Sequence, residues 1–282
     1  MYNVSIENPQ GEILDLMNTA GYTVTKVTGM EPPKADINVS DNAMLDGGVF
    51  NSARLTTRNI VITVSLGEPT EELRLGLYRF ARLKKMHKLY LSNGTRAVMA
   101  EGYAESVTVG YFDKKETVQL SYVCPDPAFH SLTTERIDFS SVASLFEFPF
   151  DIDADGIPFS TVAQDSEVNV INEGELDVGV VITLRALGNA STPIILNRNT
   201  GATITLATTM QTGDLITIDT RRGQKSVTRL RSGTTTNLLN TFDTTSEWLT
   251  LEAGDNVLYF TANSHPENIE CFLTFEPLYE GL

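Results

Sequence analysis

The stretch Asp46-Gly-Gly-Val-Phe-Asn-Ser-Ala-Arg-Leu-Thr-Thr-Arg-Asn-Ile-Val-Ile-Thr-Val-Ser-Leu66 decides the fold of the first half of the chain. A glycine turn at Gly47 and Gly48 leads into a run where apolar residues occupy every second position. Such alternation is typical of a strand with one face on a core and the other face available for contact. The apolar positions of this strand are Ile60, Ile62, Val64 and Leu66, and they alternate with Asn59, Val61, Thr63 and Ser65.

A helix is expected directly after this strand, from Thr70 to Met86. Gly67 and Pro69 separate the two, and Thr70 is a plausible N-cap followed by two carboxylates in the first turn, where the helix dipole favours them. Leu73, Leu77 and Phe80 recur at helical spacing on one face. Strand and helix are therefore expected to pack as one unit, with further strands around them.

The neighbouring segments predict more strands and one long exposed loop. Val39 to Gly48 is polar and turn-rich, and a long loop in a compact domain is most often a contact surface. After the helix, Asn93-Gly94 predicts a tight hairpin, and a second hairpin is expected between 104–112 and 116–123. Two prolines at Pro125 and Pro127 end this sheet, because proline cannot donate to its ladder.

The second half contains many short strand-like runs separated by glycine and asparagine turns, which predicts a β-sandwich. The expected fold class is therefore mainly β with one helix in the N-terminal domain. The 282-residue length favours two domains, placed at 1–135 and 136–282.

Composition limits the function classes. The formal net charge is −15, and residues 140–282 hold 7 Lys and Arg against 19 Asp and Glu, whereas residues 1–139 hold 14 against 17. This acidity argues against nucleic acid or an anionic membrane as partner. The N-terminus has neither a basic region nor an apolar region of a signal peptide, and no apolar run reaches membrane-spanning length. Cys124 and Cys271 are expected to stay unpaired.

The sequence shows no catalytic, metal or cofactor motif. Asp151-Ile-Asp153-Ala-Asp155-Gly156 matches the first half of an EF-hand loop, but Val162 stands where the loop needs a bidentate Glu. A solvated acidic turn is the favoured interpretation, and a weak calcium site with Asp165 stays open. The three histidines, His87, His130 and His265, have no ligand partners at the required spacing, so structural or surface roles are expected. No enzyme activity and no cofactor are predicted.

Trp248 is the single tryptophan of the chain and is out of phase with Leu249 and Leu251. An exposed tryptophan on a β-sandwich is a possible sugar contact, although packing under a loop is the commoner outcome. A carbohydrate-binding module acting through the second domain is thus one alternative function. Arg221, Arg222 and Lys225 form a small basic group that is expected at a hairpin tip.

An ordered set of motifs resembles the distal tail proteins of long-tailed bacteriophages, the siphophage family called Dit. In the first half these motifs are Val27-Thr-Gly29 before Pro32-Pro33, Asp46-Gly47 leading to Arg58-Asn-Ile-Val-Ile-Thr-Val64, Glu101-Gly-Tyr103, and Val118-Gln-Leu-Ser121 running into Cys124-Pro-Asp-Pro127-Ala-Phe129. In the second half they are Gly213-Asp-Leu-Ile-Thr-Ile-Asp-Thr-Arg-Arg-Gly223 and Leu251-Glu-Ala-Gly-Asp-Asn256.

This resemblance implies an N-terminal domain that forms a hexameric ring and a C-terminal galectin-like β-sandwich. The implied place is the virion tail, where the ring would join the tail tube protein to the tail-associated hub protein and anchor receptor-binding proteins. Exposed strand edges and long loops need partners. We therefore expect inter-subunit contacts at the loop with Asp46 and Gly47 and at Arg54 and Arg58.

Overall fold

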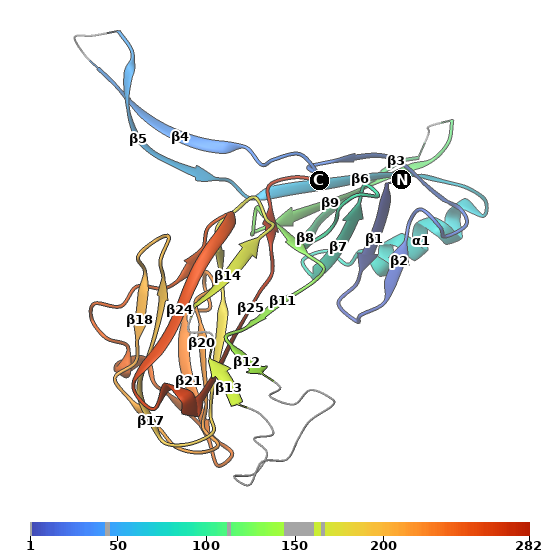
Figure 1. Cartoon of the computed structure of the whole chain (residues 1–282). Helices are drawn as coiled ribbons and strands as arrows, with labels where there is room; N and C mark the ends of the chain where they lie inside the picture. Colours follow the sequence, from blue (N-terminus) through green and yellow to red (C-terminus); the bar gives the residue numbers. More distant parts are fainter. Residues whose placement is uncertain (1, 43–45, 112–113, 144–160, 165–166) are drawn as a thin grey trace, which may run out of the picture. The chain divides into compact units, whose positions relative to one another are not determined.

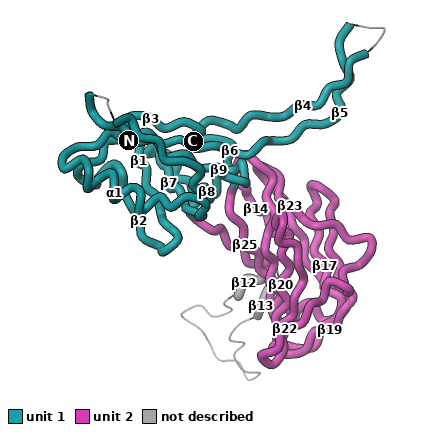
Figure 2. The backbone as a smooth tube through the Cα atoms, turned by 180° about the vertical axis from the view of Figure 1, so that it is seen from behind, with its two compact units in different colours: residues 1–132, 278–282 teal, residues 133–277 magenta. Residues whose placement is uncertain are grey.

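The computed structural model describes residues 2–42, 46–111, 114–143, 161–164 and 167–282. The chain divides into two compact units, which Figure 2 shows in different colours. Unit 1 contains residues 1–132 together with 278–282, and unit 2 contains residues 133–277. The sequence placed the boundary after residue 135 and assigned the last five residues to the second domain. Among the described residues, no helix is long and apolar enough to cross a membrane.

Unit 1 is built on one antiparallel sheet whose strands follow the order β2-β1-β7-β8-β9-β6-β3, with β10 pairing with both β8 and β26 (Figure 1). The elements of this unit are β1 (Asn3–Glu7), β2 (Ile13–Asp15), β3 (Tyr22–Thr28), β4 (Ala35–Asp41), β5 (Gly48–Leu55), β6 (Arg58–Leu66), α1 (Thr70–Phe80), β7 (Met86–Ser92), β8 (Ala97–Gly110), β9 (Thr117–Cys124), β10 (Phe129–Ser131) and β26 (Leu278–Tyr279).

The alternation that predicted β6 is confirmed in the structure. Its residues Ile60, Ile62, Val64 and Leu66 are buried in the core of unit 1, and the residues between them are partly or fully exposed. Helix α1 packs on the same core through the fully buried Leu77. The helix is nevertheless shorter than expected. The backbone N–H of Lys84 and the carbonyl of Lys85 bond to Ala104 on β8, so these residues join the sheet rather than a further helical turn.

The prediction of an exposed loop from Val39 to Gly48 is wrong in part, because the two ends of this segment belong to strands. β4 and β5 form a separate two-stranded antiparallel sheet, which we call the ribbon, and only Asn42 to Gly47 connects them. The Asn93-Gly94 hairpin is confirmed between β7 and β8. The two predicted hairpins share one strand, since β8 runs without a break from Ala97 to Gly110.

Unit 2 is a sandwich of short antiparallel strands, which confirms the mainly β fold class. One sheet has the order β11-β25-β16-β20-β21-β22 and the other has β14-β24-β17-β18 with β19 on β17. Phe139, after β11, contacts Phe260 of β24 edge to face at 6.2 Å between ring centroids, which joins the two sheets through the core. The strands are β11 (Glu135–Asp138), β12 (Ser140–Ala143), β13 (Thr161–Gln164), β14 (Glu167–Asn172), β15 (Val178–Gly179), β16 (Val181–Ala186), β17 (Ala190–Asn197), β18 (Thr203–Thr205), β19 (Thr209–Met210), β20 (Leu215–Asp219), β21 (Ser226–Arg231), β22 (Thr234–Asn237), β23 (Thr250–Leu251), β24 (Gly254–Ser264) and β25 (Ile269–Phe275), with 3-10 turns η1 (Leu239–Thr241) and η2 (Pro266–Asn268).

Candidate functional site

The ribbon consists of two strands that pair only with each other among the described strands of unit 1. Its register runs from Ala35 opposite Leu55 to Asp41 opposite Gly48, with a bulge after Asn38. Every residue of both strands is exposed, and in Figures 1 and 2 the ribbon extends beyond the main sheet. A lone two-stranded ribbon is marginally stable in water. This element is therefore expected to gain stability from a partner.

The two faces of the ribbon differ in chemistry. Directly paired residues share a face, and residues along a strand alternate between faces. The register therefore gathers six apolar side chains on one side, which we call the apolar ribbon face: Ala35, Ile37, Val39, Phe50, Ala53 and Leu55. The opposite side carries the Asp36–Arg54 ion pair at 3.2 Å, the hydrogen bond of 2.6 Å from Asn51 to Ser40, and Val49.

The apolar ribbon face is open to solvent in the isolated chain. Ile37 is 60% exposed and Phe50 is 63% exposed, and Val39 and Leu55 are exposed beside them. Single exposed apolar residues are common, but a contiguous set on one face of one element marks an interaction surface. The sequence did not single out these side chains. Ile37 and Val39 alternate with polar neighbours, a strand pattern that could have indicated them, but no strand is predicted there from the sequence.

Asp46 and Gly47 lie at the tip of the ribbon. Gly47 has a φ of +97°, a left-handed conformation that glycine adopts without steric cost. At Gly48 a Cβ atom would lie 2.4 Å from Cγ1 of Val39, so the first residue of β5 must also be small. Backbone conformation at Gly47 and close packing at Gly48 therefore explain the two glycines. Both predicted contact residues, Asp46 and Gly47, are exposed at the tip, where a partner can reach them.

Arg54 lies near the base of the ribbon, one residue pair from its end, on the face opposite the apolar one. Its side chain is 81% exposed, and that of its partner Asp36 is 57% exposed. An ion pair this exposed contributes at most about 1 kcal/mol. The Arg54 guanidinium is accordingly accessible for a partner, and the expected inter-subunit contact at this residue stays a prediction.

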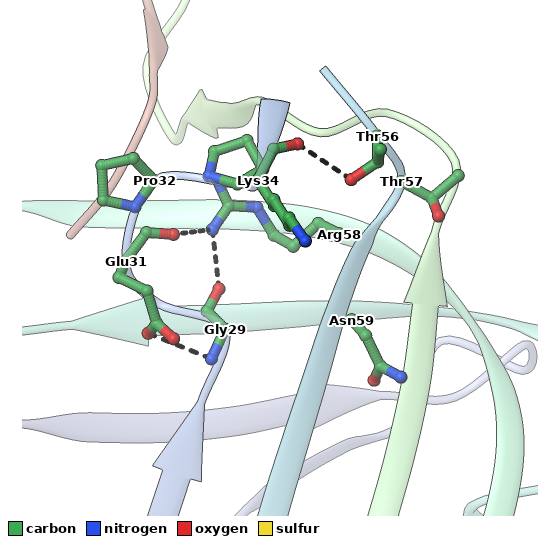
Figure 3. Close-up of a pocket in the computed structure, with 9 residues that line it drawn as sticks. Gly29, Glu31, Pro32, Lys34, Thr56, Thr57, Arg58 and Asn59 are labelled. Carbon is green, nitrogen blue, oxygen red and sulfur yellow. Dashed lines mark hydrogen bonds between the residues drawn. The ribbon is translucent and has the colours of Figure 1, made fainter. Parts of the chain in front are cut away.

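Arg58 occupies the base of the ribbon, and here the expectation of an exposed contact residue needs correction. The residue is 2% exposed. As Figure 3 shows in part, its guanidinium donates hydrogen bonds to backbone carbonyls: Nη1 to Gly29 at 2.6 Å and Glu31 at 2.8 Å, Nε to Pro127 at 2.8 Å, and Nη2 to Glu280. Arg58 therefore joins three chain segments inside unit 1 and is not available to a neighbouring subunit.

The surroundings explain how a buried guanidinium is tolerated there. The guanidinium carbon lies 3.9 Å from the centroid of the Phe129 ring, which adds a cation–π contact. Burial lowers the pKa of Arg58, while the nearby Cys124, Glu31 and Asp126 oppose this shift. Charged groups are costly to bury unless they are hydrogen-bonded. Four carbonyl acceptors supply that compensation, so the site is structural in character.

An open pocket of about 310 Å³ lies beside Arg58 at the ribbon base. Figure 3 shows the two chain segments that form it, one entering β4 and one leaving β5. Thr56 donates to the carbonyl of Lys34 from both its backbone N–H, at 3.1 Å, and its hydroxyl, at 2.9 Å, and so ties the segments together. Within the described part of the chain, no group of three or more His, Cys, Asp or Glu could hold a metal ion.

The remaining sequence-based candidates lie elsewhere. Trp248 is half-buried and stacks on Phe242 at 4.6 Å between ring centroids, with Nζ of Lys225 5.5 Å from its ring. Phe242 thus covers one face of the indole. A sugar contact at the remaining surface of Trp248 stays a prediction. Arg221 and Arg222 lie at the turn between β20 and β21, as expected for a hairpin tip.

The titratable residues considered for metal binding have other roles or lie outside the description. Both ring nitrogens of the buried His87 face backbone carbonyls, of Lys85 at 2.9 Å and of Phe80 at 3.2 Å. Cys124 and Cys271 are free and buried. The acidic segment Asp151 to Gly156 and Asp165 lie outside the described residues, and the side chain of Val162 does as well.

Comparison with known proteins gives one family match and several structural matches. Residues 173–279 match the model of the siphovirus-type tail component, C-terminal domain. The structure of SPP1 Dit, described as a paradigm of the hub adsorption apparatus in phages that infect Gram-positive bacteria, aligns with a TM-score of 0.70 and 16% identity over 99% of both chains. A chain of the phage P2 baseplate in its activated conformation with Ca aligns with a TM-score of 0.53 and 14% identity over 98% of both chains.

A search of curated protein sequences finds no match to this chain. At these identities the structural alignments establish a shared fold, and the family match covers most of unit 2. Together they confirm the resemblance to the Dit family that the ordered motifs indicated.

Proposed function

We propose that this chain, whose residues 173–279 match the siphovirus-type tail component family and whose whole fold is shared with SPP1 Dit, forms a hexameric ring at the distal end of a phage tail. In this proposal the ring joins the tail tube protein to the tail-associated hub protein and anchors receptor-binding proteins. The role is structural rather than enzymatic. The observation that carries the proposal is the exposed apolar ribbon face.

The ribbon suits a heterologous contact. Its residues lie on an element that extends away from the main sheet of unit 1, so the apolar ribbon face can reach a different part of a neighbouring molecule. Head-to-tail contacts between unlike surfaces close into rings when the rotation between subunits permits it. We propose that the apolar ribbon face of one subunit packs on unit 1 of its neighbour, with Asp46, Gly47 and Arg54 at the margin of the contact.

The assemblies to which the similar structures belong support the proposed place of the ring. One is a protein of a hub adsorption apparatus of phages, and the other belongs to a phage baseplate. Both alignments span nearly the whole chain, so unit 1 and unit 2 are each represented in a protein of that kind.

Two adjacent substitutions test the ring. Phe50→Glu places a charge on the apolar ribbon face, whereas Val49→Glu places the same charge on the opposite face at a residue that is also exposed, at 58%. We expect the unchanged chain and Val49→Glu to sediment as a hexamer and Phe50→Glu to sediment as a monomer. The folded monomer should be equally stable in both variants, because neither side chain is buried there.

Electron microscopy of the unchanged chain gives the second measurement. Six-fold rings are expected, and rings that bind purified tail tube protein would support the connector role. A chain that stays monomeric at high concentration, or a hexamer that Phe50→Glu leaves intact, contradicts the proposal.

A further inference from the structure

The last described residues, 278–282, return to unit 1 after the chain has formed unit 2, and we call them the tail segment. Strand β26 within it pairs with β10, with Tyr279 opposite Phe129 and Leu278 opposite His130. Phe129 is the ring on which the Arg58 guanidinium rests. The tail segment is therefore next to the residue that holds the ribbon base.

The tail segment also contacts the strand-to-ribbon connection directly. The backbone N–H of Leu282 donates to the carbonyl of Met30 at 3.0 Å, and the carbonyl of Glu280 accepts from Arg58. Gly281 lies so close to this connection that a Cβ atom would be 3.1 Å from Cδ of Pro32 and 3.3 Å from the carbonyl oxygen of Met30. Residues 30–32 lead straight into β4, so these contacts fix the start of the ribbon.

A second arginine holds the tail segment from the other side. Nη1 of Arg96 donates to the carbonyl of Gly281 at 2.9 Å, and its guanidinium carbon lies 4.2 Å from the centroid of the Tyr279 ring. Arg96 directly precedes β8, in the main sheet of unit 1. The tail segment is thus bonded both to the rigid sheet and to the ribbon base, which places it as a bridge between them.

We infer that the tail segment fixes the ribbon base, so that the apolar ribbon face reaches its assembly-competent position only after unit 2 has been synthesised and the chain has returned to unit 1. The step from ribbon position to assembly rests on the proposed function. The inference goes beyond it by making residues 278–282 a requirement for the ribbon to assemble.

Chain order gives this arrangement a physical consequence. The ribbon comprises residues 35–55, whereas the tail segment follows residue 277, and domains generally fold in order during synthesis. Association requires a preorganised surface, because ordering a mobile element at the moment of binding weakens the contact. An incomplete chain with a loosely held ribbon is therefore a poor partner, which keeps unfinished chains out of the ring.

Hydrogen exchange on three variants tests the inference. They are the chain ending at Pro277, Gly281→Val in the complete chain, and Arg58→Met, with Arg54→Met as the matched control on the exposed ribbon. The reporters are the backbone N–H groups of Gly29 and Thr56 at the ribbon base, and the internal reference is β6. We expect exchange at the base to rise at least tenfold in all three variants, with β6 unchanged in the shortened chain and in Gly281→Val, and with Arg54→Met like the unchanged chain. In Arg58→Met, β6 is expected to exchange faster as well, because loss of the buried hydrogen bonds destabilises unit 1.

Equal exchange at the ribbon base in the complete and shortened chains would overturn the inference. Loss of protection throughout β6 in Gly281→Val would also overturn it, because the tail segment would then support the whole core rather than the base.

The consequence for assembly is measured by mixing tagged shortened chains with an excess of complete chains and recovering the rings. Exclusion of the shortened chains is expected, and their incorporation at the input ratio contradicts the requirement. If the complete chain forms no ring, the proposed function fails, while the exchange comparison still decides whether the tail segment fixes the ribbon base.

Discussion

Arg58 shows how the chemistry of one side chain can organise several segments. A guanidinium presents five N–H donors in a planar fork, and four bonds to carbonyls are made here from one buried position. From the sequence, this residue is expected at an inter-subunit contact, because exposed strand edges and long loops need partners. Its burial depends on the carbonyls of Gly29, Pro127 and Glu280, which lie far apart in sequence, so a local pattern could not reveal it.

Arg58→Lys is expected to destabilise unit 1. Lysine keeps the charge, but its three donors diverge from one nitrogen and cannot reach all four carbonyls. Some carbonyls therefore lose their partner, and a strongly hydrated ammonium group is buried. The expected loss is about 2–4 kcal/mol in the free energy of unfolding. Urea denaturation at neutral pH, followed by a probe in unit 1, measures it. Arg54→Lys should cost under about 0.5 kcal/mol, and equal small losses would show that the buried bonds contribute little.

Asp214 is a second buried charge with a specific partner, in unit 2. It is 1% exposed, accepts from Nε of Arg231 at 2.6 Å and from Nη2 of the same residue, and accepts from the backbone N–H of Gln211 at 2.8 Å. The hydrogen bonds from Arg231, opposed by desolvation and assisted by Gln211, lower the pKa of this carboxyl. The motif Gly213-Asp214 that contributed to the family resemblance thus has a structural reason.

The lowered pKa gives Asp214 a pH-dependent effect on stability. The unfolded chain takes up the proton at higher pH than the folded one, so the contribution is fully present above about pH 4 and is lost as pH falls through the folded pKa. We expect Asp214→Asn to lower the free energy of unfolding of unit 2 by about 2–3 kcal/mol at pH 7 and by much less at pH 3. Asp36→Asn on the ribbon is the control. A penalty independent of pH would contradict the assignment.

At the scale of elements, the sequence predicts the helix and the strands whose side chains pack on a buried core. The alternation of β6, the first turns of α1, the Asn93-Gly94 hairpin and most strands of unit 2 follow from residues packed on a core. The sequence predicts a loop for the part of the ribbon from Val39 to Gly48, because this part is polar and turn-rich and neither face of the ribbon is buried. The candidate site was therefore found in part: Asp46, Gly47 and Arg54 lie on the ribbon, whereas Ile37 and Phe50 were missed.

Three buried asparagines hold the loops at one end of a sheet in unit 2. Asn172, Asn197 and Asn256 lie in β14, β17 and β24, all at most 1% exposed. Asn256 Nδ2 donates to the carbonyls of Glu252 at 2.8 Å and Gly254 at 3.0 Å, and its Oδ1 accepts from the N–H of Glu252 at 2.9 Å and from Nδ2 of Asn197 at 3.3 Å. All its hydrogen-bonding capacity is used, which explains the motif ending at Asn256.

Asn256→Asp is expected to be as harmful as Asn256→Ala, although it keeps the shape of the side chain. The carboxylate places an oxygen against two carbonyl oxygens where the amide donated. Each change should cost about 2–4 kcal/mol in unit 2 at neutral pH. Asn169→Ala, an exposed asparagine of β14, is the control. Thermal unfolding compares the three variants, and a mild effect of Asn256→Asp would show that the loop rearranges to accept the charge.

At the scale of the whole molecule, two units are joined by a chain that passes from one to the other and back. Composition suggested two parts because the negative charge is concentrated after residue 139. The return of the tail segment was not foreseen, since five residues carry no periodicity that relates them to a distant sheet. Its role depends on contacts at Arg58 and Arg96, which only the folded chain brings together.

The net charge of −15 makes a prediction about assembly in salt. Six such chains in one ring repel one another, while the proposed contact is apolar and the Debye length falls from about 30 Å at 0.01 M to about 10 Å at 0.1 M ionic strength. We therefore expect the hexamer fraction to rise several-fold between these two salt concentrations, as measured by sedimentation at fixed protein concentration. A hexamer that dissociates as salt is added would contradict this, because it would show that ion pairs such as those available to Arg54, rather than the apolar ribbon face, dominate the contact.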